Sequence, residues 1–337
     1  MADGEGLSSL YGIKADAAEI LVAIPTLNEE AHIERCVASL MDGDPRLARV
    51  QFVVSDGGST DATREILERL AARYANLSWI DNPGRLQSAA INRVVEQFGS
   101  VRTILVRCDA HSVYPEGYVT QVADAMKKLG VASLVVPMDA VGQGCFQRAN
   151  AWVVDTPLGS GGSPHRGGKS SGYVDHGHHA GFDLSFYTAV GGYDETFSHN
   201  EDAEYDARVA AAGGKVYLDS SIRLQYYPRA TIGGLARQYF DYGKGRARTL
   251  RKHRLRPKIR QLFPIASLLA VVGSVLVAPV LPLALVYPAI YFGGLMVASI
   301  WIALSKRSIC GLGAGLAAAT MHMAWAAGFL RQTFFRR

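Results

Sequence analysis

The longest uncharged apolar segment of this 337-residue chain covers residues 265–304, a length of 40 residues. A helix needs about 20 mainly apolar residues to cross the hydrocarbon core of a bilayer, so the segment is long enough for two spans. Pro279 and Pro282 divide it, because proline cannot continue a helical hydrogen-bond ladder and pushes the preceding residue out of the helical region. The sequence therefore predicts a membrane hairpin.

A third apolar segment, residues 309–330, is rich in Gly and Ala and is also long enough to cross. The run 244–260 ahead of the hairpin holds nine Lys or Arg residues, and Lys306 and Arg307 follow the hairpin. By the positive-inside rule, both groups keep the preceding domain cytoplasmic. If the third segment spans, the last three cations lie on the far side, so a re-entrant or interfacial placement stays open. These cations are Arg331, Arg336 and Arg337.

Charge is distributed unevenly along the chain. Residues 1–241 carry 21 Lys+Arg against 30 Asp+Glu, and residues 242–337 carry 14 against none, which together give the formal net charge of +5. An acidic domain followed by an apolar, basic tail is typical of a protein held at an anionic membrane leaflet, and it disfavours nucleic acid as a partner. A content of 49% hydrophobic residues excludes a disordered chain.

The N-terminal residues and the four cysteines carry no signal that assigns a function. Residues 1–18 are interpreted as an N-terminal extension, because they lack the basic start and apolar core of a secretory signal. The four cysteines lie far apart without a CxxC spacing, so we expect neither a zinc knuckle nor a disulfide framework, and a reducing compartment fits. They are Cys36, Cys108, Cys145 and Cys310.

Short apolar, β-branched runs alternate with helical spacing in the first 136 residues. The predicted strands are 20–24, 50–54, 77–80, 103–106 and 133–136. The predicted helices are 30–40, 61–74, 86–98 and 115–129, with Thr60 or Asp61 as the N-cap of the second. This alternation predicts an α/β domain with a mostly parallel sheet, whose ligands bind beyond the carboxyl ends of the strands.

Polar loops follow the first two predicted strands. The second loop contains Asp56, which can accept the ring N–H of a uracil-like base, and Ser59, which offers a hydroxyl. Gly57 and Gly58 let the backbone approach a ligand closely. Asp-Gly is also a common turn signal, and that reading stays open.

Acidic residues also follow the fourth predicted strand and begin a later predicted helix. Asp109 and His111, at positions i and i+2 beyond a strand, can face one ion, although an Asx-turn with an incidental histidine explains them equally. Residues 201–206 place four acids at the start of a helix that ends near Gly213. Acids in a first turn complement the helix dipole, but adjacent Glu201 and Asp202 point in different directions, so one of them faces inward or into a cleft as a candidate general base.

Residues 155–179 are Gly- and Ser-rich and contain two prolines and four histidines. A long segment of this composition is typical of a lid or a disordered loop. For its last three histidines we favour acceptor contact or solvation over metal binding. They are His176, His178 and His179.

Five segments together resemble inverting glycosyltransferases of family 2, which have the GT-A fold. They are VAIPTLNEE (22–30), VVSDGGSTD (53–61), DAH (109–111), VGGYDE (190–195) and NED (200–202). Their order and spacing match over about residues 19–250. The DAH variant and the apolar tail are most similar to the bacterial succinoglycan-type enzymes, which build exopolysaccharide repeats on a lipid carrier.

The resemblance and the apolar segments together imply an organisation for the whole chain. A cytosolic GT-A domain (19–230), with a Rossmann-like, mostly parallel sheet and flanking helices, is followed by an amphipathic basic interface segment (231–260). A membrane domain (261–337) with about three apolar transmembrane helices completes the chain. Residues 238–242 occupy the place of the Gln-x-x-Arg-Trp motif of processive synthases but depart from it, which argues against processive synthesis.

The resemblance also implies site residues. The nucleotide-sugar would contact Pro25, Thr26, Asn28, Glu29, Asp56, Gly57, Ser59, Arg85, Asn92 and Asp109. Asp202 would be the catalytic base, and Asp109 with His111 would bind a divalent cation, Mn²⁺ or Mg²⁺. Most relatives have a second aspartate in place of His111, and imidazole suits Mn²⁺ better than Mg²⁺. The acceptor or the membrane interface would contact Glu201, Arg237, Gln238 and Tyr242, with Tyr239 and Phe240 at headgroup depth.

The expected activity is that of a membrane-bound inverting hexosyltransferase on the cytoplasmic face of a bacterial inner membrane. It would move a sugar from a UDP-sugar to a polyprenyl-diphosphate-linked saccharide in exopolysaccharide biosynthesis, by a metal-assisted single displacement. Glucose is implied only by the resemblance. Two alternatives stay open: a synthase that transfers the sugar to polyprenyl phosphate, and a non-catalytic membrane scaffold or flippase partner.

Overall fold

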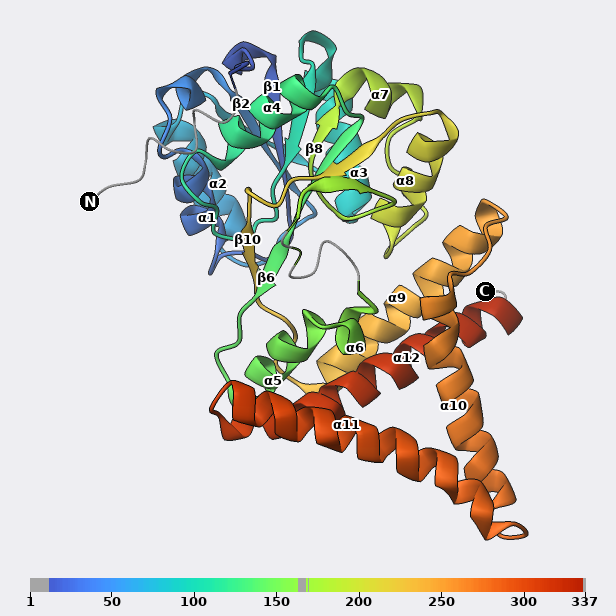
Figure 1. Ribbon diagram of the computed structural model, residues 1–337. Coiled ribbons are helices and arrows are strands. Elements are labelled where there is room, and N and C mark those ends of the chain that lie inside the picture. The colour runs from blue at the N-terminus through green and yellow to red at the C-terminus, as the bar shows by residue number, and fades with distance from the viewer. Residues whose placement is uncertain (1–11, 163–167, 169, 336–337) are drawn as a thin grey trace. The chain divides into compact units, whose positions relative to one another are not determined.

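The computed structural model describes residues 12–162, 168 and 170–335 (Figure 1). They form two compact units: one holds the chain up to residue 138 and residues 168–225, and the other holds residues 139–167 and 226 onward. The predicted domain 19–230 is therefore interrupted, because residues 139–167 belong to the second unit. Three regions named above lie partly or wholly outside the described residues. They are much of the predicted N-terminal extension, part of the segment 155–179 including Pro164 and His165, and the last two residues, Arg336 and Arg337.

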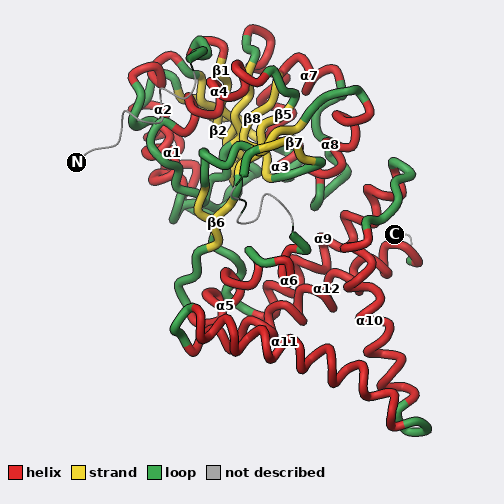
Figure 2. The backbone as a smooth tube through the Cα atoms, viewed as in Figure 1, coloured by secondary structure: helices red, strands yellow, loops and turns green. Residues whose placement is uncertain are grey.

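The first unit is built on an eight-stranded sheet of order β3-β2-β1-β4-β8-β5-β9-β7 (Figure 2). Strands β3, β2, β1 and β4 run parallel to one another, as do β5 and β9, whereas β8 runs antiparallel to β4 and β5, and β7 runs antiparallel to β9. The strands are β1 (Ile20–Thr26), β2 (Gln51–Asp56), β3 (Leu77–Asp81), β4 (Ile104–Arg107), β5 (Ser133–Val136), β7 (Gly172–Val174), β8 (His178–Asp183) and β9 (Val216–Leu218). All five predicted strands and the mostly parallel α/β sheet are confirmed.

The predicted helices are also confirmed, although all four begin later than predicted, by one to three residues. The α-helices of this unit are α1 (Ile33–Leu40), α2 (Thr63–Arg73), α3 (Gln87–Phe98), α4 (Tyr118–Leu129), α7 (Leu184–Ala189) and α8 (Glu201–Ala211). Short 3₁₀ helices cover Ala17–Glu19, Pro45–Arg49 and Gly99–Val101. Helix α2 begins later than predicted because the Asp61 carboxylate accepts the Thr63 N–H in a turn ahead of it, and Ala62 takes the N-cap position.

Helices cover both faces of the sheet, as successive residues of β8 illustrate. Phe182 packs into the cluster that contains Ile91 of α3 and Tyr205 of α8. A Cβ atom on the preceding Gly181 would lie 2.8 Å from the Val122 side chain of α4. Because adjacent strand residues point to opposite faces, α4 lies on the face opposite α3 and α8.

The segment 155–179 is more ordered than its composition suggests, and the expectation of a long structureless loop is wrong for its described residues. It contains α6 (Pro157–Ser160) and β7, and its last two residues, His178 and His179, begin β8. Pairing of β7 with β9 and of β8 with β5 satisfies backbone groups that composition alone leaves unassigned.

The second unit is helical apart from its connection to the first. Strands β6 (Met138–Ala140) and β10 (Leu224–Tyr226) pair where the chain passes between the units. The helices are α5 (Cys145–Val154), α6, α9 (Ile232–Lys252), α10 (Ile259–Val277), η5 (Pro282–Leu285), α11 (Val286–Ser305), η6 (Ile309–Gly313) and α12 (Ala314–Phe334). Three segments, 259–277, 282–305 and 309–334, are long and apolar enough to cross a membrane.

The predicted interface segment 231–260 is mainly one helix, α9, which ends at Lys252. Its small residues pack against α12 instead of facing lipid: Gly243 and Gly245 are buried, and a Cβ on Gly243 would lie 2.0 Å from the carbonyl oxygen of Trp325. The turn predicted at Pro279 and Pro282 is present between α10 and α11.

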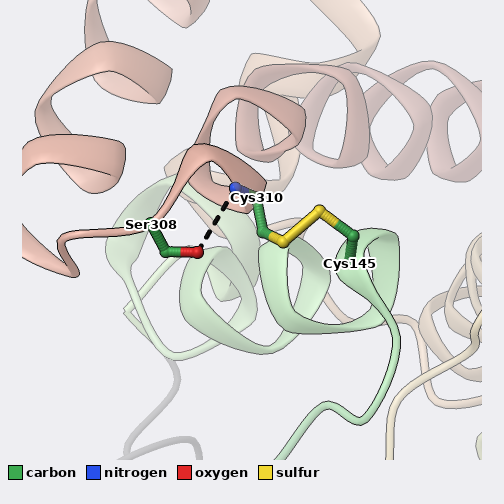
Figure 3. Close-up of a disulfide and its surroundings, with 3 residues drawn as sticks. All are labelled: Cys145, Ser308 and Cys310. Atoms are coloured by element: carbon green, nitrogen blue, oxygen red, sulfur yellow. Dashed lines mark hydrogen bonds between the residues drawn. A yellow bond between two sulfur atoms is a disulfide. The ribbon is translucent and has the colours of Figure 1, made fainter.

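A disulfide corrects the prediction that the cysteines are unpaired (Figure 3). Cys145 at the start of α5 is bonded to Cys310 in η6, with the two Cα atoms 4.9 Å apart. These cysteines are separated by 165 residues, so no local spacing could indicate the pair. Cys36 and Cys108 are buried free thiols of the first unit.

The disulfide predicts a definite thiol count. Alkylation of the denatured, unreduced chain should add two groups, on Cys36 and Cys108, and prior reduction should raise the number to four. Intact mass measures both numbers. Cys310→Ser is the control, with three groups expected whether or not reductant is present; four groups on the unreduced wild type would contradict the pair.

Candidate active site

The loops after β1 and β2 are tied to each other at the carboxyl edge of the sheet. The Asn28 N–H donates to Ser59 Oγ and the Thr60 N–H donates to Asn28 Oδ1, each over 2.8 Å. The Glu29 N–H donates to Thr63 Oγ1, also over 2.8 Å. Asn28 has a φ of +55°, a conformation that asparagine tolerates better than most residues. The structure thus brings the two predicted nucleotide loops together.

Asp56 is fully buried in this pair of loops. Its carboxylate accepts the N–H groups of Gly58 and Ser59 and hydrogen bonds from the Ser59 hydroxyl and from Arg64 Nε. These contacts shape the loop. Binding of a base N–H by Asp56 stays a prediction, and it requires one of these donors to give way.

Other predicted nucleotide residues occupy different settings. Pro25 and Thr26 end β1, and the Gly57 N–H donates to the Thr26 carbonyl. Arg85 is exposed, with a φ of +58°. The Asn92 amide donates to the Tyr193 carbonyl and Glu195, and its oxygen accepts from the Tyr187 hydroxyl and the Tyr193 N–H. All four hydrogen-bonding positions of the Asn92 side chain are therefore used, and they hold the 192–195 segment instead of facing a nucleotide.

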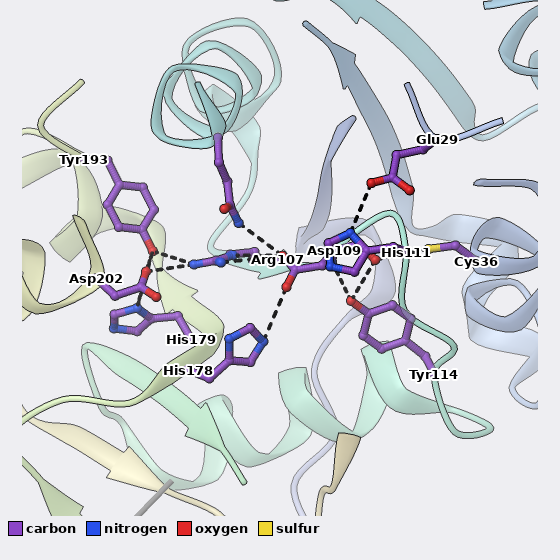
Figure 4. A network of polar contacts seen from close by, with 11 residues as sticks. Glu29, Cys36, Arg107, Asp109, His111, Tyr114, His178, His179, Tyr193 and Asp202 are labelled. Carbon is purple, nitrogen blue, oxygen red and sulfur yellow. Dashed lines mark hydrogen bonds and ion pairs between the residues drawn. The ribbon is translucent and has the colours of Figure 1, made fainter. Parts of the chain in front are cut away.

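Arg107, the last residue of β4, lies between two carboxylates (Figure 4). Its side chain is 5% exposed, with Nη1 2.7 Å from Asp202 Oδ1 and Nε 3.4 Å from Asp109 Oδ1. Burial opposes charge on both carboxyls, but Arg107 together with the neighbouring histidines outweighs burial and holds the pKa values of Asp109 and Asp202 below their usual range. Both groups are therefore ionised at neutral pH.

Asp202 receives all of its described hydrogen bonds on one oxygen. Oδ1 lies 2.7 Å from Arg107 Nη1, 2.7 Å from the Tyr193 hydroxyl and 3.1 Å from His179 Nδ1. Among the described residues, none donates to Oδ2, and 24% of the side chain is exposed. The arrangement fixes one oxygen and leaves the other accessible.

His179 is fully buried between two carboxylates, with Nδ1 facing Asp202 and Nε2 lying 2.8 Å from Asp206 Oδ1. Both ring nitrogens can donate only in the imidazolium form. Burial alone would lower the pKa of His179, but the charges of Asp206 and Asp202 and their hydrogen bonds raise it to about 9. The interpretation of this histidine as an acceptor contact or solvated side chain is wrong.

Two local backbone features orient the side chains of His178, His179 and Tyr193. A β-bulge between Leu134 and Val135 shifts the pairing of β5 with β8 next to His178 and His179. Gly192 has a φ of +65°, and a Cβ there would lie 2.5 Å from Asn92 Oδ1. The turn that presents the Tyr193 hydroxyl to Asp202 therefore requires glycine.

Asp109 lies beside two imidazoles and one amide. Its Oδ2 is 3.8 Å from His178 Nε2, and its Oδ1 accepts from Gln87 Nε2 over 3.1 Å. His111 is 62% exposed, and its Nδ1 lies 3.1 Å from Glu29 Oε1. Among the described residues there is no group of three or more His, Cys, Asp or Glu side chains already arranged around one point. The Asp109 carboxylate and one of these imidazoles fit two coordination positions of a divalent cation. A diphosphate and water would supply the other ligands.

The remaining acids of α8 differ in environment. Burial, together with Asp202, raises the pKa of Glu201 to about 7. Glu204 is buried and pairs with Arg208 at 2.7 Å, so its contact is internal to the helix. Asp206 faces inward to His179 and does not serve merely as a first-turn charge.

The other predicted acceptor residues belong to the second unit. Arg237, Gln238 and Tyr242 lie on α9, where Gln238 Nε2 donates to the Tyr242 hydroxyl over 3.0 Å. Their contact with an acceptor stays a prediction.

Several site residues were missed from sequence. Arg107 had a signal, since it is a lone cation in an otherwise apolar strand, and His178 and His179 belong to a conspicuous histidine cluster. Gln87, Tyr193 and Asp206 had none specific to the site, because their partners are 9 to 27 residues away along the chain.

Comparison with known proteins identifies relatives of this chain. Residues 21–189 match glycosyl transferase family 2. The chain is 43% identical over 326 residues to the succinoglycan biosynthesis protein ExoA of Rhizobium meliloti (strain 1021), covering 94% of this chain and 96% of that protein. It is 23% identical over 269 residues to a dolichyl N-acetyl-α-D-glucosaminyl phosphate 3-β-D-2,3-diacetamido-2,3-dideoxy-β-D-glucuronosyltransferase of Methanococcus voltae, covering 76% and 81%.

A solved structure shares the fold. The mannosyltransferase PcManGT of Pyrobaculum calidifontis, in complex with GDP-Man and Mn²⁺, matches with a TM-score of 0.60 and 17% identity over 97% of this chain and 91% of its own. This likeness supports the GT-A architecture.

The buried imidazolium gives stability a specific pH dependence. Because the folded-state pKa of His179 is raised from 6.5 to about 9, its contribution is fully present below pH 6.5 and is lost as the pH rises through 9. The difference in unfolding free energy between wild type and His179→Asn, measured by denaturant unfolding, should therefore shrink from pH 6.5 to 9.5, by an amount on the order of 3 kcal/mol. His111→Asn is the exposed control, and a constant difference between wild type and His179→Asn would contradict the assignment.

Proposed function

Since the chain belongs to glycosyl transferase family 2, we propose that this glycosyltransferase moves one sugar, glucose in the leading case, from a UDP-sugar to a polyprenyl-diphosphate-linked saccharide in succinoglycan-type exopolysaccharide biosynthesis. The name of the Rhizobium meliloti relative supports the pathway. The acceptor of the Methanococcus voltae relative, a lipid phosphate carrying a sugar, supports a lipid-linked acceptor.

One observation carries the proposal: Asp202 has one oxygen held by three donors and the other accessible. An ionised, oriented carboxylate at the rim of a sheet suits general-base catalysis, which contributes about 10²- to 10⁴-fold. Arg107, His179 and Tyr193 act as positioning residues, since they limit rotation of the carboxylate. The low pKa of Asp202 makes it a weak base, so proton transfer accompanies formation of the new bond and does not precede it.

The reaction is a single displacement. The acceptor hydroxyl oxygen bonds to the anomeric carbon while its proton passes to Asp202 Oδ2, and the bond to the diphosphate breaks with its electron pair on the leaving oxygen. Attack opposite the leaving group inverts the anomeric centre, so an α-linked donor yields a β-linked product.

Asp109, with His111 or His178, would hold a Mn²⁺ or Mg²⁺ ion that neutralises the departing diphosphate. The loops 25–29 and 56–59 would hold the uridine, with Arg85 exposed at the edge of this site. Glu201, next to the base, would contact the acceptor.

Membrane attachment follows from the three apolar segments, and we propose the inner membrane with the first unit in the cytoplasm. Nine cations in residues 244–260 support this orientation. The alternative acceptor is polyprenyl phosphate itself. Acid lability of the radiolabelled lipid product separates the two, because a sugar on a monophosphate is released by mild acid whereas a glycosidic sugar remains on its saccharide.

Asp202→Asn tests the base. The amide keeps the size of the side chain but cannot accept the proton, so transfer should fall at least about 100-fold while UDP-sugar binding persists. Glu201→Gln should retain more activity, and the surface variant Glu34→Gln is the matched control. Transfer rates and donor affinity by calorimetry measure the outcome; normal turnover by Asp202→Asn would reject the assignment.

Asp109→Asn tests the cation site. With UDP present, Mn²⁺ should raise the thermal midpoint of the wild type because a ligand of the native state stabilises it, and this shift should disappear in Asp109→Asn. His111→Ala and His178→Ala should show which imidazole binds the ion, because the variant that loses a ligand needs a higher Mn²⁺ concentration for half-saturation. An unchanged Mn²⁺ titration of Asp109→Asn would overturn the site.

A further inference from the structure

Helix α9 carries too much charge to enter the bilayer. Its 21 residues include six Lys or Arg and one Asp. A charged side chain is costly at the centre of a bilayer, and a helix of 21 residues cannot place all six cations at its ends. This helix therefore lies outside the hydrocarbon core.

Helix α12 is in backbone contact with α9 over its second half. A Cβ on Gly328 would lie 1.9 Å from the Phe240 carbonyl oxygen, and one on Gly243 would lie 2.0 Å from the Trp325 carbonyl oxygen. Nearer the C-terminal end of α12, Arg251 Nη1 donates to the Gln332 carbonyl. These contacts leave no room for lipid between the two helices.

The first half of α12 is bound to other polar elements of the same unit. Ala314, Ala317 and Met321 pack with Leu235 of α9 and with Val153 of α5. His322 Nε2 lies 2.7 Å from the Leu158 carbonyl oxygen of α6, while the Tyr291 hydroxyl faces its Nδ1. Along its length, α12 thus contacts α9, α5 or α6, and its first half also contacts Leu295 and Tyr291 of the apolar helix α11.

The other two apolar helices are different. Half of the apolar window of α12 is buried within the protein, against 6% for α10 and 17% for α11. Helices α10 and α11 therefore bury few of their residues within the protein, as expected of a spanning hairpin, whereas α12 buries many more.

From these contacts we infer that α12 lies along the membrane surface and does not cross it. One of its faces is exposed or half-buried among the described residues and is mostly apolar: Leu316, Thr320, Met323, Ala327, Leu330 and Phe334. The partner of this face is the headgroup and acyl-chain boundary of the bilayer, into which amphipathic helices insert their apolar side. It is continuous with the membrane hairpin through η6.

A surface placement of α12 puts the cations of the tail on one side of the membrane. With two spans, Arg331 returns to the same side as Lys306 and Arg307, in agreement with the positive-inside rule. The six cations of α9 lie near lipid phosphates at the same depth as α12. None of this depends on the reaction that the first unit performs.

Reporter fusions to the full chain count the spans. A phosphatase–fluorescent protein reporter at the C-terminus should report the same compartment as one at the N-terminus, and a reporter inserted after Val280, at the exposed tip between α10 and α11, should report the opposite one. Three spans would place the C-terminal reporter with the Val280 reporter, and that result would overturn the inference.

Depth measurements test the placement of the face itself. Nitroxides on Leu316→Cys, Met323→Cys and Leu330→Cys should lie at depths within about 5 Å of one another in vesicles with one-third anionic lipid. A spanning helix would separate the first and last by about 20 Å, since 14 residues rise 1.5 Å each. Ile290→Cys and Val297→Cys on α11 are the spanning control, with an expected difference of about 10 Å. Native Cys36 and Cys108 are buried and do not compete for label.

Discussion

The candidate active site depends on one buried guanidinium. Arg107 ends β4 and pairs with Asp202 and Asp109, two acids that come from distant parts of the chain. Without that cation, two carboxylates would face each other in a poorly solvated setting and at least one would take up a proton. With it, both are ionised, and the roles of base and cation ligand can be divided between them.

Around this pair, the site is held by residues that do not touch substrate in the proposed reaction. His179 and Asp206 support Asp202 from behind, and Asn92 uses its whole amide to fix the turn that carries Tyr193. Such support explains why a loop-built site can be precise: each loop is anchored to a helix or strand at a defined atom.

The sequence was sufficient for the elements and for the order of the site, and insufficient for its internal contacts. Apolar runs bounded by turns located β1 to β5, and motif register named Asp109 and Asp202 as candidates, which the structure brings to either side of Arg107. It misplaced Asn92, whose partners are 95 to 103 residues away, and it missed the Cys145–Cys310 pair and the inward orientation of Asp206. Hydropathy registers apolar content and not the packing of Gly328 against Phe240, on which the inferred surface placement of α12 rests. In each case the deciding interaction is long-range.

The most direct test of this account is a double-mutant cycle between Arg107→Met and Asp202→Asn, read as unfolding free energy of the full chain at pH 7. Removing one partner of a buried ion pair typically costs about 3 to 5 kcal/mol, because the other charge is left uncompensated. The account predicts that the second change costs far less once the first is made, with a coupling of about 2 kcal/mol or more. Additive effects, with a coupling below about 0.5 kcal/mol, would show that Arg107 does not hold Asp202.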